Sequence, residues 1–225
     1  MTQPLSRVLR LRVWGERACF TRPEMKVERV SYEVMTPSAA RGVVEAVLWR
    51  PQMRWRIERV DVLAPIRWDS VRRNEVDRKV PLRPVLAAMN GGRADLGIDA
   101  DDPRVRQQRA ATILRDVDYV IHARIALTAR AGPEDTLAKY VAMFERRAAA
   151  GQCFHRPYLG TREFAADFAP LAADAPPPIA ENRDLGWMLL DIDHGRGGPA
   201  PMFFPARLDN GSLAVPPPEA EEVRR

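Results

Sequence analysis

Residues 36–49, TPSAARGVVEAVLW, have the pattern of an α-helix and decide how the rest of the chain is interpreted. Thr36 can cap the helix with its side chain, and Pro37 suits the first helical position. The apolar residues that follow recur at helical spacing, and Pro51 cannot continue a helix. The sequence therefore predicts a helix over residues 37–49.

The segments on both sides of this helix alternate between apolar and polar residues, which is typical of half-buried strands. Residues 7–14 are RVLRLRVW, with Arg10 and Arg12 on one face, and residues 53–68 are MRWRIERVDVLAPIRW. We therefore predict a strand before the helix and a long strand or hairpin arm after it.

A second strand and helix follow further along the chain. Residues 111–128, ATILRDVDYVIHARIALT, alternate again and are rich in β-branched side chains, which predicts a strand. Residues 132–151, GPEDTLAKYVAMFERRAAAG, begin with proline and acids and end in glycine, which predicts a helix. Between the strands predicted over residues 53–68 and 111–128, we expect residues 70–108 to form an arginine-rich, protruding connection with weak intrinsic order.

The last third of the chain differs in composition, since 11 of the 20 prolines follow residue 150. Short strands are expected there, around residues 186–192 and 202–215. The order of elements predicts an α+β fold with a ferredoxin-like core. We expect residues 1–150 to form that core, and residues 151–225 to form a glycine-containing loop and a small C-terminal β-rich subdomain.

Charge is distributed unevenly along the chain. Residues 1–80 carry a net charge of +7, residues 81–150 carry +2 and residues 151–225 carry −4. A basic N-terminal part indicates a polyanionic partner such as a nucleic acid, although the same excess also fits an ordinary solvated surface.

Several classes of protein and site are excluded by what the sequence lacks. Cys19 and Cys153 form no CxxC pair or Cys/His cluster, so neither a disulfide framework nor a zinc site is expected. Asp191 and Asp193 alternate on a tail strand and are expected to face solvent, which leaves no carboxylate cluster for a metal nuclease. No run approaches the roughly 20 apolar residues of a membrane span, and a reducing cytoplasm fits this pattern.

Four stretches are recognisable when taken together: LRLRVWGERACFTRPEMKVERVSYEVMTPSAARGVVEAVLWRP (9–51), RRNEV (72–76), RQQRAATILRDVDYVIHA (106–123) and RDLGWMLLDID (183–193). In this order they resemble the Cas-five-d family of CRISPR-associated proteins from type I-C systems. The resemblance implies a repeat-associated (RAMP) protein with a ferredoxin-like core of the RNA-recognition type. It also implies cutting of precursor CRISPR RNA within each repeat, without metal or cofactor.

The same resemblance implies a set of partners. Members of the family stay bound to the 5′ handle of the crRNA inside the interference complex. The expected partners are therefore the crRNA and its precursor repeat, the backbone and large subunits of Cascade, and target DNA near the foot of the complex. A catalytically weak or inactive scaffold that binds the handle is the alternative.

Candidate catalytic residues follow from the resemblance and from the chemistry of RNA cleavage. The 2′-hydroxyl must lose a proton, the leaving 5′-oxygen must gain one, and the phosphorane charge must be neutralised. Family members use a tyrosine or histidine at the end of the first helix and a Lys-His pair early in the second. At these three positions the chain has Leu48, Lys139 and Tyr140, so only the lysine matches.

Two accounts of this departure stay open. Lys139 can stabilise the phosphorane while Tyr140 donates a hydrogen bond or acts as a perturbed acid or base. Alternatively, one of the three histidines, His122, His155 or His194, replaces the missing one. His155 is favoured because it follows the second helix directly, whereas His122 is in an alternating strand, where a structural role is more usual. Asp135, four residues before Lys139, also allows the lysine an ordinary surface ion pair.

Candidate RNA-binding residues are basic side chains, helped by one asparagine, in three parts of the chain. Trp14, Phe20 and Tyr32 are available to stack on bases, although a place in the core is as compatible with their sequence context. The candidates are Arg10, Arg12, Arg22, Lys26 and Arg29 near the N-terminus, Arg72, Arg73, Asn74, Arg106 and Arg109 on the connection, and Arg156 and Arg162 in the glycine-containing loop.

Overall fold

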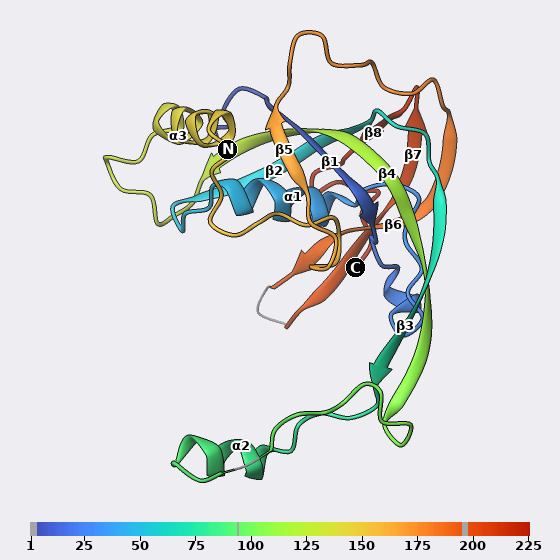
Figure 1. Ribbon diagram of the computed structural model, residues 1–225. Coiled ribbons are helices and arrows are strands. Elements are labelled where there is room, and N and C mark those ends of the chain that lie inside the picture. The colour runs from blue at the N-terminus through green and yellow to red at the C-terminus, as the bar shows by residue number, and fades with distance from the viewer. Residues whose placement is uncertain (1–3, 94, 195–197) are drawn as a thin grey trace.

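The computed structural model describes residues 4–93, 95–194 and 198–225, and its strands form one antiparallel sheet (Figure 1). The eight strands are β1 (Leu9–Ala18), β2 (Met53–Val62), β3 (Trp68–Val76), β4 (Arg106–Leu127), β5 (Asp167–Pro170), β6 (Arg183–Asp193), β7 (Ala200–Asp209) and β8 (Ser212–Ala214). The helices are α1 (Pro37–Val47), α2 (Leu82–Met89), α3 (Leu137–Ala149) and a short 3-10 helix, η1 (Pro23–Met25).

The central strands have the ferredoxin order. β5, β1, β4 and β2 are neighbours in the sheet in that sequence. α1 lies between β1 and β2 in the chain, and α3 lies between β4 and β5. This is the split β-α-β arrangement of a ferredoxin-like core, and the predicted α+β fold is confirmed.

The first helix begins where its sequence predicts and ends two residues earlier. The Thr36 hydroxyl accepts a hydrogen bond from the Ala39 amide at 3.3 Å, and Pro37 is the first helical residue. Leu48 already has extended backbone angles, and from there the chain turns into β2. The helix therefore does not reach Trp49.

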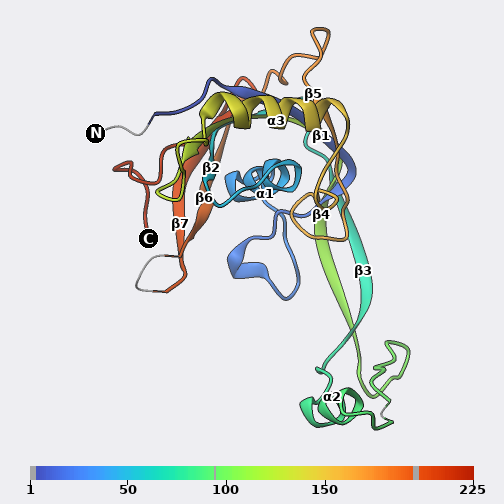
Figure 2. The same ribbon diagram turned by 90° about the vertical axis from the view of Figure 1, so that its left-hand side faces the viewer.

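The segment between residues 70 and 108 is a hairpin arm in the structure. β3 pairs with the first half of β4, from Trp68 opposite Leu114 to Val76 opposite Arg106. Figures 1 and 2 show this arm extending away from the rest of the molecule, with α2 at its far end. Where the sequence predicts weak order, the chain forms a two-stranded ribbon and a helix.

The tail strands extend the same sheet. β6 and β7 form a hairpin, and β8 pairs with both β7 and β2. The strand predicted over residues 202–215 is divided into β7 and β8 by a turn at Asn210 and Gly211, both of which have positive φ angles. The division of the chain into two parts at residue 150 stays a prediction.

The core lies between the sheet and its two central helices. Figure 2 shows α1 between β4 on one side and β6 and β7 on the other. Trp55 of β2 packs against Phe144 of α3, with ring centroids 4.8 Å apart. Phe20 and Tyr32 are fully buried here, so the suggestion that they stack on bases is wrong. Within the described ranges, no helix is long and apolar enough to cross a membrane.

Candidate functional site

The first turn of α3 brings Asp135, Lys139 and Tyr140 together. The Thr136 hydroxyl caps the helix by accepting a hydrogen bond from the Lys139 amide at 3.2 Å. Lys139 is exposed, and its Nζ lies 3.4 Å from an Asp135 carboxylate oxygen. The Tyr140 ring is buried, and its hydroxyl donates a hydrogen bond to the same oxygen. The ion pair expected from the sequence is confirmed, and the tyrosine joins it.

The electrostatics of this cluster fix its protonation at neutral pH. Burial, followed by the hydrogen bond and charge of Asp135, raises the pKa of Tyr140 to about 12. The hydrogen bond from Tyr140, supported by Lys139, lowers the pKa of Asp135. Tyr140 is therefore a protonated donor and Asp135 is a carboxylate, so neither is a strong base near neutrality.

The C-terminal end of α1 is joined to three other parts of the chain. A helix end leaves carbonyl oxygens without partners inside the helix, and other groups must bind them. Here the Phe154 amide donates to the Ala46 oxygen at 2.8 Å, Arg147 Nη1 to the Val47 oxygen at 3.0 Å, and Trp55 Nε1 to the Leu48 oxygen at 2.8 Å. α3, β2 and the segment 152–158 therefore meet at this end of α1.

Leu48 and His155 occupy different surroundings near this junction. The Leu48 side chain is buried in the core and supplies no titratable group. His155 is exposed, with Nδ1 3.3 Å from the Arg156 carbonyl oxygen and its ring stacked on Tyr158. The contacts of His155 are thus within its own loop, whereas Lys139 and Tyr140 are in contact with Asp135.

The candidates near the N-terminus differ in how firmly they are paired. Arg12 forms two hydrogen bonds to Asp118, at 2.6 and 3.1 Å, and lies over the ring of half-buried Trp14. Arg10 and Lys26 are exposed, and neither has a carboxylate within 4 Å among the described residues. These two cations are the ones left open to an anionic partner.

Two further candidates from this region are engaged in ion pairs. Arg22 lies 2.9 Å from Glu33 and stacks over Tyr32, and Arg29 lies 3.5 Å from Glu75 of β3. Arg29 therefore links the loop after β1 to the far end of β3 in the arm.

The arm presents its candidates on two opposite faces. Arg73 is bonded to Glu163 and lies over the Phe164 ring. Arg72, its neighbour in sequence, points to the other face and is exposed, as side chains alternate along a strand. Asn74 shares the face of Arg72, Arg106 is exposed at the start of β4, and Arg109 pairs with Glu75 at 3.5 Å.

The glycine-containing loop after α3 packs against β1. Arg156 is exposed and pairs with Asp167 at 2.7 Å, and Arg162 is exposed. Gly160 has a φ of +86°, and a Cβ added there would lie 2.0 Å from the Cys19 carbonyl oxygen. Glycine is required at this position for close packing of two backbones.

A buried pair that the sequence did not point to lies on β2 and β4. His122 Nε2 is 2.7 Å from Asp61, and Ser212 of β8 donates a hydrogen bond to the other oxygen of the same carboxylate. Burial opposes ionisation of Asp61, but the hydrogen bonds from His122 and Ser212 lower its pKa overall. The pair joins the core sheet to the tail.

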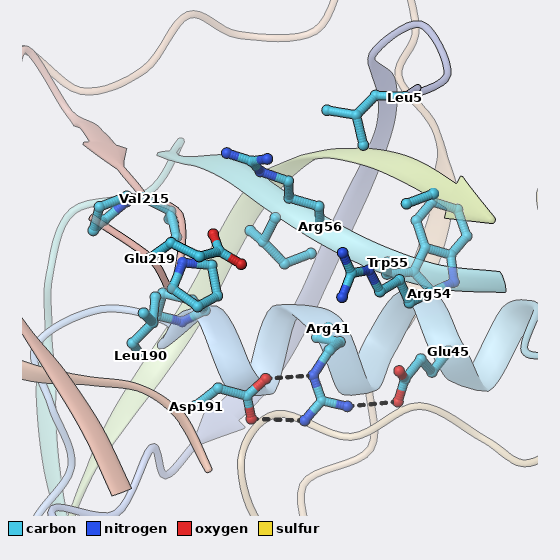
Figure 3. Close-up of a pocket in the computed structure, with 15 residues that line it drawn as sticks. Leu5, Arg41, Glu45, Arg54, Trp55, Arg56, Leu190, Asp191, Val215 and Glu219 are labelled. Atoms are coloured by element: carbon cyan, nitrogen blue, oxygen red, sulfur yellow. Dashed lines mark hydrogen bonds and ion pairs between the residues drawn. The ribbon is translucent and has the colours of Figure 1, made fainter. Parts of the chain in front are cut away.

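A cavity of about 660 Å³ lies between α1, β2 and the tail (Figure 3). Arg41 of α1 lies at one side of it and binds both oxygens of Asp191, at 2.7 and 2.8 Å, as well as Glu45 at 2.8 Å. The prediction that Asp191 faces solvent is therefore wrong, because Arg41 of α1 binds its carboxylate. The arrangement fastens β6 to α1.

Comparisons with known proteins agree with this fold. The model of the Cas5d family, described as a CRISPR-associated protein, matches residues 8–216. Two solved structures, a CRISPR-associated protein and a functionally uncharacterized protein from Streptococcus mutans, superpose with TM-scores of 0.71 and 0.69. Each is 21% identical in sequence, and the match covers 100% of both chains.

Two curated relatives are similar over almost their whole length. A protein from Mannheimia succiniciproducens is 51% identical, over 96% of this chain and 98% of its own. One from Thermus thermophilus is 41% identical, over 96% and 95%. Both are named CRISPR pre-crRNA endoribonuclease Cas5d. The chain therefore belongs to the Cas5d family of CRISPR-associated proteins.

Proposed function

We propose that this protein cuts precursor CRISPR RNA within each repeat and keeps the 5′ handle of the product bound. The strongest support is the near full-length similarity to two relatives that are named pre-crRNA endoribonucleases. The lysine expected from the family pattern is also exposed, at the first turn of α3, where an RNA backbone can reach it. We further propose the backbone and large subunits of Cascade as protein partners, with target DNA nearby.

The proposed reaction is an attack of the 2′-oxygen on the adjacent phosphorus. The 2′-hydroxyl loses its proton, the bond to the 5′-oxygen breaks, and that oxygen gains a proton, which leaves a 2′,3′-cyclic phosphate. Lys139 stabilises the charge of the phosphorane. Tyr140 is protonated at neutral pH, so it holds Asp135 and can only donate a proton or a hydrogen bond. His155 is the candidate base. To act in this step, its imidazole must come within hydrogen-bond distance of the 2′-hydroxyl next to the phosphate that Lys139 stabilises.

Binding is proposed to depend on cations that have no carboxylate partner among the described residues. Arg10, Lys26 and Arg72 are exposed, whereas Arg12 and Arg73 are already paired. An unpaired cation binds a phosphate without first breaking an ion pair. Affinity should therefore fall steeply with salt, because each neutralised phosphate releases counterions.

The test is cleavage of the cognate repeat RNA by purified protein in EDTA. Lys139→Ala should slow the single-turnover rate by about 100-fold, as expected for the loss of one group that stabilises transition-state charge, and leave RNA affinity nearly unchanged. Lys139→Arg retains the charge and should keep much of the rate. Lys79→Ala, an exposed lysine of the arm, is the control. Equal rates for Lys139→Ala and Lys79→Ala would contradict the assignment.

A scaffold that binds the handle without cutting is the second candidate function. It is favoured by the buried Leu48 and by the engagement of the Tyr140 hydroxyl with Asp135. Wild-type protein that binds the repeat but does not cut it over hours would support the scaffold. If cleavage occurs, loss of the rate in His155→Ala but not in Tyr140→Phe would assign the base to His155, and the reverse result would assign the reaction to Tyr140.

A further inference from the structure

Two large aromatic side chains are exposed beside the candidate active site. Phe154 is 88% exposed and Trp49 is 58% exposed, although both are of types that usually contribute much of their surface to a core or an interface. Both residues are also close in sequence to candidate residues, since Trp49 follows Leu48 and Phe154 precedes His155.

A hydrogen bond holds the backbone of Phe154 at the C-terminal end of α1, and Trp49 follows that end in the chain. The Phe154 amide binds the Ala46 carbonyl oxygen at 2.8 Å. Ala46 precedes Trp49 by three residues, so their Cα atoms lie at most about 10 Å apart along the chain. The two rings therefore originate close together, from segments that are more than 100 residues apart in the chain.

The segment that follows Trp49 contacts the loop that leads into α3. The turn after Trp49 is fixed by Thr128, whose amide donates to the Gln52 oxygen at 2.9 Å and whose hydroxyl donates to the Pro51 oxygen at 2.7 Å. Thr128 begins the loop that leads into α3. The charge of Arg50 also acts on Tyr140, where it opposes the rise of the pKa. The charge of Arg50 is therefore felt at Tyr140, and Trp49 precedes Arg50 in the chain.

Aromatic rings next to cations form a surface suited to single-stranded RNA. The rings stack on unpaired bases, and the cations bind the phosphates between them. Exposed Arg50 follows Trp49, whereas Arg156, two residues after Phe154, is exposed but paired with Asp167 at 2.7 Å, so Arg50 is the cation that is open to a phosphate. A surface for a protein partner would not need this alternation of rings with positive charge.

We propose that Trp49 and Phe154 form a stacking platform for unpaired bases of the RNA that flank the scissile phosphate. This inference rests on the proposed function. The platform holds the strand extended between α3 and the loop 152–158, so that the phosphate to be cut lies next to Lys139. It gives binding energy that does not depend on phosphate charge.

The test uses a repeat RNA with a 2′-deoxy sugar at the cut site, which prevents cleavage, and 2-aminopurine at single unpaired positions. Stacking quenches the fluorescence of 2-aminopurine, so wild-type protein should quench it at positions next to the cut. Trp49→Ala and Phe154→Ala should each lose quenching at one position and weaken RNA binding by about tenfold. The slope of affinity against salt should stay unchanged, since the same phosphates are neutralised.

Two kinds of variant distinguish stacking from other effects: substitutions that keep a ring, and a substitution of an exposed tryptophan elsewhere on the surface. Trp49→Phe and Phe154→Tyr keep a ring and should retain both quenching and affinity, whereas Phe154→Leu keeps only apolar area and should not. Trp187→Ala is the matched control, because Trp187 is 52% exposed but lies on β6. Thermal unfolding of each variant checks that the fold is intact.

Two outcomes would overturn the proposal. If Trp49→Ala and Phe154→Ala bind and cut RNA as Trp187→Ala does, the platform does not exist. If Phe154→Leu behaves as wild type, the ring acts by apolar packing and not by stacking on a base. The proposed function fails separately, when wild-type protein neither binds nor cuts the repeat.

Discussion

At the level of single residues, Asp135 connects the two candidate catalytic side chains of α3. Its carboxylate accepts a hydrogen bond from the Tyr140 hydroxyl and lies within ion-pair distance of the Lys139 ammonium group. The lysine is therefore partly neutralised before RNA binds, and the phosphate must compete with Asp135 for it. An exposed pair of this kind contributes little to stability, so the competition costs little.

The hydrogen bond from Tyr140 to Asp135 makes the stability of the fold depend on pH, and the sign of this dependence follows from the pKa of Tyr140. The pKa of Tyr140 in the folded protein, about 12, is above the ordinary value near 10, so the folded state holds the proton more tightly. This contribution to stability is complete below about pH 10 and is lost as the pH rises through about 12. The free energy of unfolding should be measured by denaturation from about pH 8 to 12. The difference between wild type and Tyr140→Phe, in favour of wild type, should shrink across that interval.

The double variant supplies the control for this prediction. In an Asp135→Asn background the acceptor is uncharged, and the difference between Tyr140 and Phe should depend less on pH. A difference between wild type and Tyr140→Phe that stays constant from about pH 8 to 12 would contradict the assignment.

The sequence could place only part of this site. Helical spacing puts Asp135 one turn before Lys139, and that pair is present. Periodicity could not place the Tyr140 hydroxyl on the same carboxylate, because Asp135 precedes the cap residue Thr136 and is outside the helix. It also gave no reason to expect that Phe154 binds the end of a helix more than 100 residues earlier, which is a property of tertiary packing.

At the level of elements, the two faces of β3 place two adjacent arginines in different surroundings. Arg73 is bonded to Glu163 and lies over Phe164, so it anchors the arm to the loop after α3. Arg72 is on the opposite, exposed face, where RNA can reach it. We therefore propose that Arg72 binds RNA and Arg73 anchors the arm, because a strand alternates its side chains.

The pair of variants Arg72→Ala and Arg73→Ala tests this separation. Arg72→Ala should weaken RNA binding and lower the slope of log affinity against log salt by about 0.7 for each phosphate that it no longer neutralises, with unchanged stability. Arg73→Ala should lower the free energy of unfolding by about 1 kcal/mol and leave the salt slope nearly as in wild type. Filter binding at several salt concentrations and urea denaturation give both quantities. Identical behaviour of the two variants would refute the division.

The arm also explains where prediction from sequence failed for an element. One face of the ribbon is exposed and the other is only half-buried and mostly polar, so the apolar alternation that revealed β1 and β2 is absent from residues 70–108. Alternation of apolar residues predicts a strand only from residue 111 onward, but pairing with β3 extends β4 back to Arg106.

At the level of the whole molecule, the tail and the core share one sheet. β8 pairs with β2 of the core and β7 of the tail, Ser212 binds the Asp61–His122 pair, and Asp191 binds Arg41. The many prolines after residue 150 suggested that the tail forms a small subdomain of its own. It could not indicate that these strands continue the core sheet, because strand neighbours distant in sequence leave no local pattern.

One sheet should unfold as one unit. In hydrogen exchange of the whole protein, the amides of β6 and β7 should open with about the same free energy as those of β1 and β4. Asp191→Ala should lower that free energy by about 1 kcal/mol in all four strands. Glu219→Ala, which removes another carboxylate at the same cavity, is the control. Earlier opening confined to the tail would contradict the single unit.

The length of β4 has a mechanical consequence. Its 22 residues measure about 70 Å along the strand, and this one strand runs from the far end of the β3–β4 ladder through the ladders with β1 and β2. A pull on α2 along this strand loads those ladders in shear, so many hydrogen bonds must break at once. A pull across the arm would instead open the β3–β4 ladder one bond at a time. The molecule is therefore stiff along β4 and compliant across the arm.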